Sequence, residues 1–239
     1  MNTDTAVAPV APSAAPYIVD ATFAGAIVYV VDDDAAVRRL VAAMLGGEGI
    51  RVEQCTSAEQ FLSVAAPEQR GCVLLDVDMP GMNGPALQRV LTERKLSLPV
   101  VFLTGTVDVG TSVEVMKQGA TDVVLKPFKK DRLVAATRHA LELDAKQAAV
   151  NRRQSIARQR HALLNPRERE VMEAVVAGLA NKQIARKLDL SEKTIEVHRA
   201  RVMAKMGADS LADLVRLALD VGVGPPAGET GARRAAGDE

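Results

Sequence analysis

The stretch LLDVDMPGMNGPALQRV, residues 74–90, joins an apolar run to carboxylates and then to a tight turn. Leu74 and Leu75 have the character of a buried strand, and Asp76 and Asp78 follow at once. Negative charge at the mouth of a buried element is costly unless it meets a metal, a cation or a reaction. The pattern therefore predicts a chemical site at the end of a strand.

Strand-like and helix-like segments alternate on both sides of this stretch. The expected strands are AIVYVV (26–31), RVEQC (51–55), CVLLDV (72–77), LPVVFLT (98–104) and TDVVLK (121–126). The expected helices are AAVRRLVAAMLGG (35–47), SAEQFLSVA (57–65), GPALQRVLTER (84–94) and VGTSVEVMKQG (109–119). Near-continuous apolar strands alternating with helices predict an α/β fold, a five-stranded parallel sheet covered on both faces.

Polar side chains stand at the carboxyl ends of these strands, where ligands of parallel sheets bind. They are Asp32, Asp33 and Asp34 after the first strand, Asp76 after the third, Thr104 after the fourth and Lys126 after the fifth. Clustered carboxylates repel one another unless a hard divalent cation lies among them, and Mg²⁺ prefers oxygen ligands. A carboxylate beside such an ion can attack a phosphoryl group, with lysine and threonine stabilising its oxygens. Asp34 is also suited to cap the first helix.

Four motifs in this half, VVDDD, LLDVDMPGMNG, FLTG and LKPF, together resemble the receiver domain of bacterial two-component response regulators. The resemblance covers about residues 25–145 and implies a flavodoxin-like fold. It implies that Asp76 accepts a phosphoryl group from a sensor histidine kinase. It further implies a Mg²⁺ site made by Asp32, Asp33, Asp76 and the backbone carbonyl of Asp78. Thr104 and Lys126 match the residues that stabilise the phosphoryl group, and the peptide bond between Lys126 and Pro127 is expected to be cis.

Val123 departs from the receiver pattern, because an aromatic residue is common three positions before the lysine. A valine cannot swing a ring to couple phosphorylation to the surface of the domain. The coupling either runs through Thr104 and backbone shifts, or is weaker, or is absent. A regulator whose receiver acts as a constitutive dimer module is therefore kept as an alternative.

Asp76 and Asp78 also match the DxD loop of haloacid-dehalogenase-like phosphatases, whose second aspartate is a general acid. This second alternative would make the protein an enzyme. The chain has neither a recognisable cap domain nor a later acidic pair at that family's spacing. A protein that is not an enzyme is therefore the favoured interpretation.

Composition fits two small globular domains, since the 239 residues are 48% hydrophobic and 25% charged. The formal net charge is zero, but acids lead between Asp20 and Asp144, and bases lead from Lys146 onward. Such a split is typical of phosphate or metal chemistry kept apart from nucleic-acid binding. Cys55 and Cys72 lie in apolar contexts, which favours buried free thiols in a reducing cytosol.

The two ends of the chain are expected to be disordered, over residues 1–24 and 223–239. No Lys or Arg precedes Arg38, so the start lacks the basic region of a signal peptide, and Asp20 interrupts the next apolar stretch. A cytoplasmic protein without a membrane segment is expected.

Residues 132–164 run without Gly or Pro from the last helix of the first half into an Arg-rich stretch. They form either one long helix or a helix followed by a flexible linker. We place a helical linker at 146–162, which either pairs with a partner subunit or presents a solvated charged face.

Four short helical segments follow, at 165–178, 181–190, 191–208 and 210–222. Asn165, Pro166 and Glu168 supply a cap, an N1 proline and a capping-box acid. The pattern predicts a helix-turn-helix core with a fourth helix added.

On a helical wheel of the third segment, one face is apolar and the opposite face is small and polar. The polar face is suited to enter the major groove, and His198, at the edge of the apolar face, is expected to be packed or bonded to backbone. The residues expected to contact DNA, through bases or phosphates, are Asn181, Lys182, Ser191, Lys193, Thr194, Glu196, Val197 and Arg201.

Residues 163–222 resemble the LuxR-type helix-turn-helix over their whole length, and a receiver followed by this module is most similar to the FixJ/NarL group of response regulators. The resemblance implies an all-α four-helix domain that binds promoter DNA. It also implies a homodimer on two half-sites, with contacts from Leu211, Leu214, Val215 and Ala218. A sensor histidine kinase and RNA polymerase are the further partners implied, and Mg²⁺ is the cofactor. The expected function is phosphorylation-dependent regulation of transcription.

Overall fold

The computed structural model describes residues 23–105 and 115–224. The chain divides into two compact units, with the boundary between Ala148 and Ala149. The predictions of disorder at the two termini lie outside the described residues except for 23–24 and 223–224, and so does most of the helix expected over 109–119.

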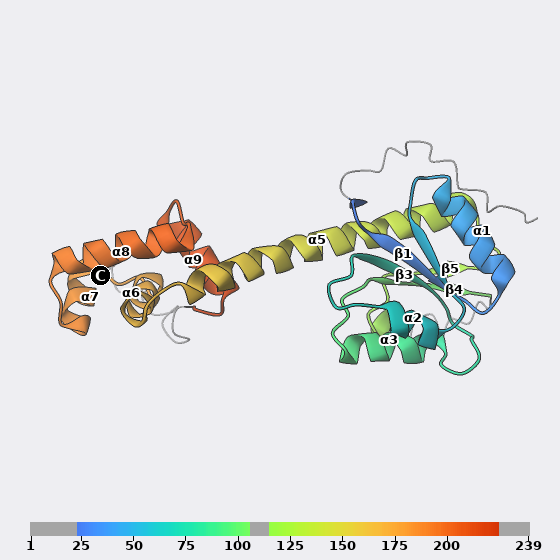
Figure 1. Ribbon diagram of the computed structural model, residues 1–239, viewed down its shortest axis with the longest axis horizontal. Coiled ribbons are helices and arrows are strands. Elements are labelled where there is room, and N and C mark those ends of the chain that lie inside the picture. Colours follow the sequence, from blue (N-terminus) through green and yellow to red (C-terminus); the bar gives the residue numbers. More distant parts are fainter. Residues whose placement is uncertain (1–22, 106–114, 225–239) are drawn as a thin grey trace, which may run out of the picture. The chain divides into compact units, whose positions relative to one another are not determined.

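The first unit contains a parallel sheet of five strands in the order β2-β1-β3-β4-β5 (Figure 1). The strands are β1 (Ile27–Val31), β2 (Val52–Cys55), β3 (Gly71–Asp76), β4 (Val100–Thr104) and β5 (Asp122–Leu125). The order doubles back between β1 and β3, so the carboxyl ends of these two neighbouring strands form the point where such folds bind ligands. The predicted five-stranded α/β fold is confirmed.

Helices cover both faces of the sheet (Figure 1). They are α1 (Ala35–Gly46), α2 (Ala58–Val64), α3 (Gly84–Glu93) and α5 (Lys130–Ala162). Tyr29, Val73 and Phe102 point to one apolar cluster, which includes residues of α2 and α3. The alternate residues of the same strands point to a second cluster with residues of α1 and α5. All residues of β1, β3 and β4 are buried, as expected for a parallel sheet with two covered faces.

Side-chain caps fix where the helices of this unit begin. Asp34 accepts a hydrogen bond from the backbone N–H of Ala36 at 2.7 Å, which confirms its predicted capping role. Ser57 caps α2 by accepting from the N–H of Gln60. In a capping box, the Gln60 side chain would accept in return from the backbone N–H of Ser57. It accepts instead from the N–H of Thr56.

Helix α5 is continuous from Lys130 to Ala162, so the first of the two alternatives for this segment is the one observed. In the first unit, its buried Asp144 accepts a hydrogen bond from Nε of Arg70 at 2.6 Å. In the second unit, Ala157 lies in the apolar core. The boundary between the units falls inside the segment predicted as a helical linker.

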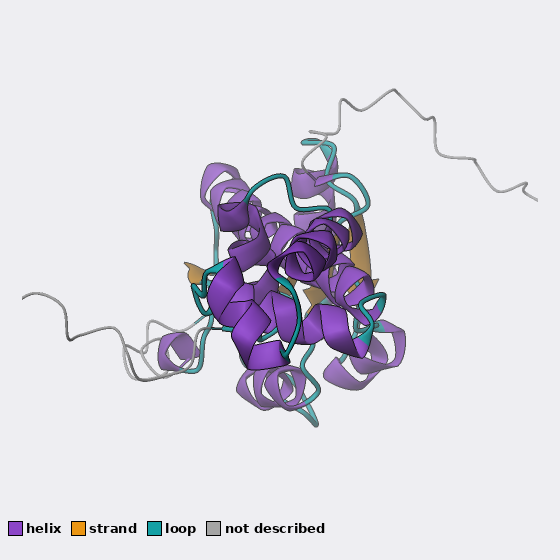
Figure 2. Cartoon of the chain, turned by 90° about the vertical axis from the view of Figure 1, so that its left-hand side faces the viewer, coloured by secondary structure: helices purple, strands orange, loops and turns teal. Residues whose placement is uncertain are grey.

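The second unit consists of helices around its own apolar core (helices are purple in Figure 2). They are α6 (Pro166–Val176), α7 (Asn181–Leu188), α8 (Glu192–Met206) and α9 (Leu211–Asp220). The predicted four-helix domain is confirmed. Asn165 and Glu168 form the predicted capping box, with each side chain accepting from the other residue's backbone N–H. Gly207 ends α8 with a φ of +62°, a conformation that favours glycine.

Candidate functional site

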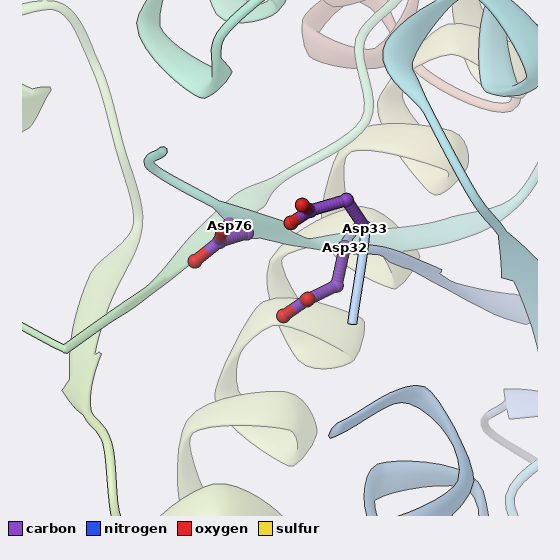
Figure 3. A group of neighbouring side chains, drawn as sticks. All are labelled: Asp32, Asp33 and Asp76. Atoms are coloured by element: carbon purple, nitrogen blue, oxygen red, sulfur yellow. The ribbon is translucent and has the colours of Figure 1, made fainter. Parts of the chain in front are cut away.

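Three carboxylates meet at the carboxyl ends of β1 and β3 (Figure 3). Asp32 and Asp33 follow β1, and Asp76 is the last residue of β3. One oxygen from each residue lies within 4.8 Å of the others. Asp32 and Asp76 are buried, whereas Asp33 is exposed. The sheet therefore brings together three of the acidic residues that were selected from the sequence.

Lys126, which follows β5, bridges two of these carboxylates. Its Nζ donates to Oδ2 of Asp32 at 2.7 Å and to Oδ1 of Asp76 at 2.8 Å. The peptide bond between Lys126 and Pro127 is cis, as expected. Oδ1 of Asp32 accepts from the N–H of Asp34, so both Asp32 oxygens are engaged. Within the described residues, Oδ2 of Asp76 accepts no hydrogen bond.

Burial and charge act in opposite directions on this site. Burial raises the pKa of Asp76, the Lys126 ammonium lowers it, and the negative charges of Asp32 and Asp33 raise it again, with a net increase. Burial alone would lower the pKa of Lys126, but its bonds to Asp32 and Asp76 outweigh burial and raise that pKa. Lys126 is therefore a cation at neutral pH and compensates the buried negative charge.

The three carboxylates of Asp32, Asp33 and Asp76 together also suit a Mg²⁺ ion as ligands. The ion prefers hard oxygen ligands, and in an octahedral shell the ligand oxygens lie about 3 to 4 Å apart. One oxygen from each of the three carboxylates lies within 4.8 Å of the others, which is close to that spacing. The donor set therefore fits the ion.

Thr104 and Asp78 complete the predicted site. Thr104 is the last residue of β4, the neighbour of β3, and its side chain is buried. The Asp78 side chain is exposed and lies outside the group of three carboxylates. Sequence reasoning assigned its role to the backbone carbonyl, and that assignment stays a prediction.

Gly84 explains how the turn after Asp76 stays compact. A Cβ atom at this position would overlap the backbone carbonyl oxygen of Asp76 and lie 2.9 Å from Cε1 of Phe102. Only glycine therefore permits α3 to begin so close to the end of β3. Sequence reasoning quoted this glycine as part of the turn but did not foresee the close approach.

Val123 lies in β5 and is half-buried against the apolar cluster on the α2 and α3 face. Its carbonyl oxygen accepts a hydrogen bond from Arg132, which also forms an ion pair with Asp122. Arg132 thereby fastens the start of α5 to β5.

The predicted reading face of α8 is exposed. Ile195, Val202 and Met206 lie in the core of the second unit, as the helical wheel predicts. The exposed residues on the opposite side are Lys193, Glu196, Val197, Ala200 and Arg201. Val197 has 46% of its surface exposed, which is unusual for a valine and suits an apolar contact outside the chain.

Three of the remaining residues predicted to contact DNA form hydrogen bonds within the chain. Ser191 caps α8 by accepting from the N–H of Thr194, and the two hydroxyl groups are 2.7 Å apart. Asn181, the first residue of α7, accepts a hydrogen bond from Arg199 at 2.8 Å. Lys182 is exposed. Sequence reasoning did not select Arg199, because an arginine in a basic helix gives no signal of its partner.

His198 is half-buried on α8, and its Nδ1 is buried without a hydrogen-bond partner among the described residues. His198 was expected to be either packed or bonded to backbone, and this nitrogen is packed.

The four residues predicted for dimer contact divide into two groups. Leu214 and Ala218 are buried in the core of their own unit and have no surface to offer a second copy. Leu211 is 50% exposed, and Val215 is half-buried. Leu219, which sequence reasoning did not select, is 57% exposed and lies four residues after Val215. The dimer contact itself stays a prediction; Leu211, Val215 and Leu219 form the partly exposed apolar stripe of α9.

The comparisons with known proteins agree with this arrangement of two units. Residues 28–138 match the family model for the response regulator receiver domain, and residues 162–218 match that for bacterial regulatory proteins of the luxR family. The fold and these matches define a response regulator with a receiver and a LuxR-type DNA-binding domain.

The relatives make the assignment more specific. The chain is 46% identical over 198 residues to the transcriptional regulatory protein FixJ of Azorhizobium caulinodans, covering 83% of this chain and 94% of the relative. It is likewise 46% identical to FixJ of Rhizobium meliloti, covering 83% and 97%. The chain belongs to the FixJ family of response regulators.

Solved structures show the same organisation. The response regulator StyR superimposes with a TM-score of 0.74 at 39% identity, covering 82% of this chain and 98% of that one. Full-length FixJ from B. japonicum gives a TM-score of 0.50 at 43% identity, covering 82% and 97%. Within the described ranges, none of the helices has the length and apolar character needed to cross a membrane.

Proposed function

We propose that Asp76 is the phosphorylated residue of this response regulator. The proposal rests on the difference between the environments of the two Asp76 carboxylate oxygens. Oδ1 is held by Lys126, whereas Oδ2 accepts no hydrogen bond within the described residues and remains available as a nucleophile. In the reaction, Oδ2 forms a bond to phosphorus while the bond from phosphorus to the phosphohistidine nitrogen of a sensor histidine kinase breaks.

Asp32, Asp33 and Asp76 would hold the metal cofactor, together with the backbone carbonyl of Asp78. Bound Mg²⁺ supplies positive charge to the phosphoryl oxygens and orients them. Lys126 pairs with a phosphoryl oxygen, and the Thr104 hydroxyl donates to another. Lys126 already forms ion pairs with both Asp32 and Asp76. Phosphorylation adds negative charge at Asp76 and would therefore strengthen the attraction of Lys126 to Asp76 relative to Asp32.

The second unit would bind promoter DNA as a homodimer. The exposed residues of α8 enter the major groove, with Val197 against a thymine methyl and Glu196, Lys193 or Arg201 at base edges or phosphates. Lys182, Asn181, Ser191 and Thr194 lie at or near the N-terminal ends of α7 and α8, where phosphate contacts are favourable. The stripe of Leu211, Val215 and Leu219 on α9 supplies apolar surface for the second copy.

The proposed domain limits are 25–145 for the receiver, 146–162 for the helical linker and 163–222 for the DNA-binding domain. Phosphorylation would increase promoter affinity, and the promoter-bound protein would contact RNA polymerase. A regulator with these partners works in the cytoplasm. Val123 supports a second candidate function, DNA binding that is independent of phosphorylation, because it lacks a ring to transmit the change.

The phosphorylation site can be tested with acetyl phosphate and Mg²⁺, followed by intact-mass measurement. Wild-type protein is expected to gain one phosphoryl group, and Asp76→Asn to gain none. Asp78→Asn is the matched control, because the proposed role of Asp78 lies in its backbone, and it is expected to react like wild type. Phosphorylation of the Asp76→Asn variant at the wild-type level would refute the assignment.

A further inference from the structure

Arg199 connects the two helices that form the helix-turn-helix. It lies on α8, and its Nη1 donates a hydrogen bond to Oδ1 of Asn181, the first residue of α7, at 2.8 Å. Both residues are half-buried. Since Ile184 of α7 and Ile195 of α8 share one apolar core, the bond adds a polar tie to an existing packing contact.

The chemistry of this bond fixes the orientation of the Asn181 side chain. A guanidinium group only donates hydrogen bonds, so the carboxamide must turn its oxygen toward Arg199. Its Nδ2 group, with two N–H donors, then points away from the guanidinium. No described residue accepts a hydrogen bond from Nδ2. Asn181 therefore offers two donors to an acceptor outside the chain.

The surroundings favour an anionic acceptor. Lys182 follows Asn181 and is exposed, so positive charge stands next to the free amide. Ala180, which precedes α7, has no side chain that can cap the helix. The positive charge of Arg199 also polarises the carboxamide and strengthens its N–H donors. A phosphate oxygen of the DNA backbone has the matching chemistry.

We propose that Arg199 is a positioning residue of the DNA interface, which holds Asn181 with its carbonyl inward and its amide toward a DNA phosphate. This inference rests on the proposed function, since it requires that α7 and α8 bind DNA. Arg199 itself does not touch the nucleic acid. It sets the position of a phosphate contact on α7 relative to the reading face of α8.

The test uses the full chain and two duplexes of equal length. One is selected by wild-type protein from a random-sequence library, and the other is unrelated. Arg199→Met and Asn181→Ala should each weaken binding to both duplexes by about two- to tenfold, as expected for one lost hydrogen bond. The double variant should bind no more weakly than Asn181→Ala alone, because Arg199 acts through Asn181.

The salt dependence of binding separates positioning from direct contact. Arg199→Met should leave the slope of log affinity against log salt unchanged. Lys182→Ala, the matched control for a charged phosphate contact, should reduce the slope by about one. A reduced slope for Arg199→Met, or additive losses in the double variant, would show direct contact and overturn the proposal.

The Asn181→Asp variant should fold like wild type, since its carboxylate can still accept a hydrogen bond from Arg199. The substitution replaces the two amide donors with an anion. The variant should bind DNA more weakly than Asn181→Ala. Wild-type affinity in this variant would overturn the inference and leave the proposed function intact. If wild-type protein selects no duplex and shows no salt-dependent binding, the proposed function itself fails.

Discussion

Lys126 is the residue that makes the acidic pocket possible. A buried pair of carboxylates without a cation would cost several kcal/mol, and the ammonium group within 2.8 Å of both removes most of that cost. The same arrangement leaves one Asp76 oxygen without a bond from the described residues. At the scale of single residues, the Lys126 bridge therefore offsets the cost of burying the two carboxylates.

Gly84→Ala tests the close approach of α3 to the end of β3. The added methyl group would overlap the Asp76 carbonyl, so we expect a loss of about 1–3 kcal/mol in the free energy of unfolding. Gly46→Ala is the control, because nothing lies within 4 Å of a Cβ there, and alanine at that helical position should stabilise by about 0.5–1 kcal/mol.

Urea unfolding followed by tyrosine fluorescence checks this prediction, since Tyr29 lies in the core of the first unit. Equal stability of the Gly84→Ala and Gly46→Ala variants would contradict the steric account.

The pocket was the most predictable part of the site. Parallel strands end at one edge of a sheet, so Asp32, Asp76, Thr104 and Lys126 could be expected to converge from their positions in the sequence alone. The bridging of Asp32 and Asp76 by Lys126, and the bond from Arg199 to Asn181, could not be foreseen. These contacts depend on side-chain rotamers across elements distant in sequence, which periodicity does not encode.

At the scale of elements, α5 shows why the sequence left two alternatives for the linker. Its apolar spacing thins after Val150, so packing gives no signal there. The observed helix is held by polar contacts in the second unit. Arg153 forms a bidentate ion pair with Asp220, and Arg160 donates to the carbonyl oxygen of Met206 at 2.9 Å. Such contacts to later helices cannot be read from the sequence of α5.

The stripe on α9 gives a similar lesson. The family resemblance named positions 211, 214, 215 and 218 as one dimer surface. The α9 helix has buried residues at Leu214, Leu217 and Ala218, so part of the predicted surface faces the core. Helical periodicity predicts which residues share a face, but not which of two apolar faces the core uses.

Glu168 provides a pH test at the level of a helix cap. Its buried carboxylate accepts from Lys205 at 2.6 Å and from the N–H of Asn165 at 2.9 Å. These two bonds lower the pKa of Glu168 below its usual 4.5. The ionised form is thus favoured in the folded state, and its stabilising effect is present above pH 4.5 and lost as pH falls through the lower folded pKa.

Glu168→Gln keeps the cap but removes the charge that pairs with Lys205. Since Lys205 is 38% exposed, we expect the variant to be less stable by about 1 kcal/mol at pH 7. The difference from wild type should shrink below pH 4.5. Denaturant unfolding followed by circular dichroism at both pH values measures it, and a difference that does not change with pH would contradict the assignment.

At the scale of the whole molecule, two units with separate cores must be coupled for phosphorylation to control DNA binding. A shift from about 1% to about 99% active protein needs roughly 5.5 kcal/mol of differential interaction. One hydroxyl bond from Thr104 and one screened ion pair with Lys126 supply less than that. In the proposed mechanism, dimerisation on DNA would contribute the remainder, because each copy would add its own phosphorylation energy.

Control of DNA affinity by the state of Asp76 can be tested by a binding measurement. Binding of the selected duplex is measured for wild type and Asp76→Asn, with and without beryllofluoride and Mg²⁺ as a phosphoryl mimic. We expect wild-type affinity to rise by about 5- to 150-fold and Asp76→Asn to stay unchanged. Equal wild-type affinity with and without the mimic would contradict the account and favour a receiver that acts without phosphorylation.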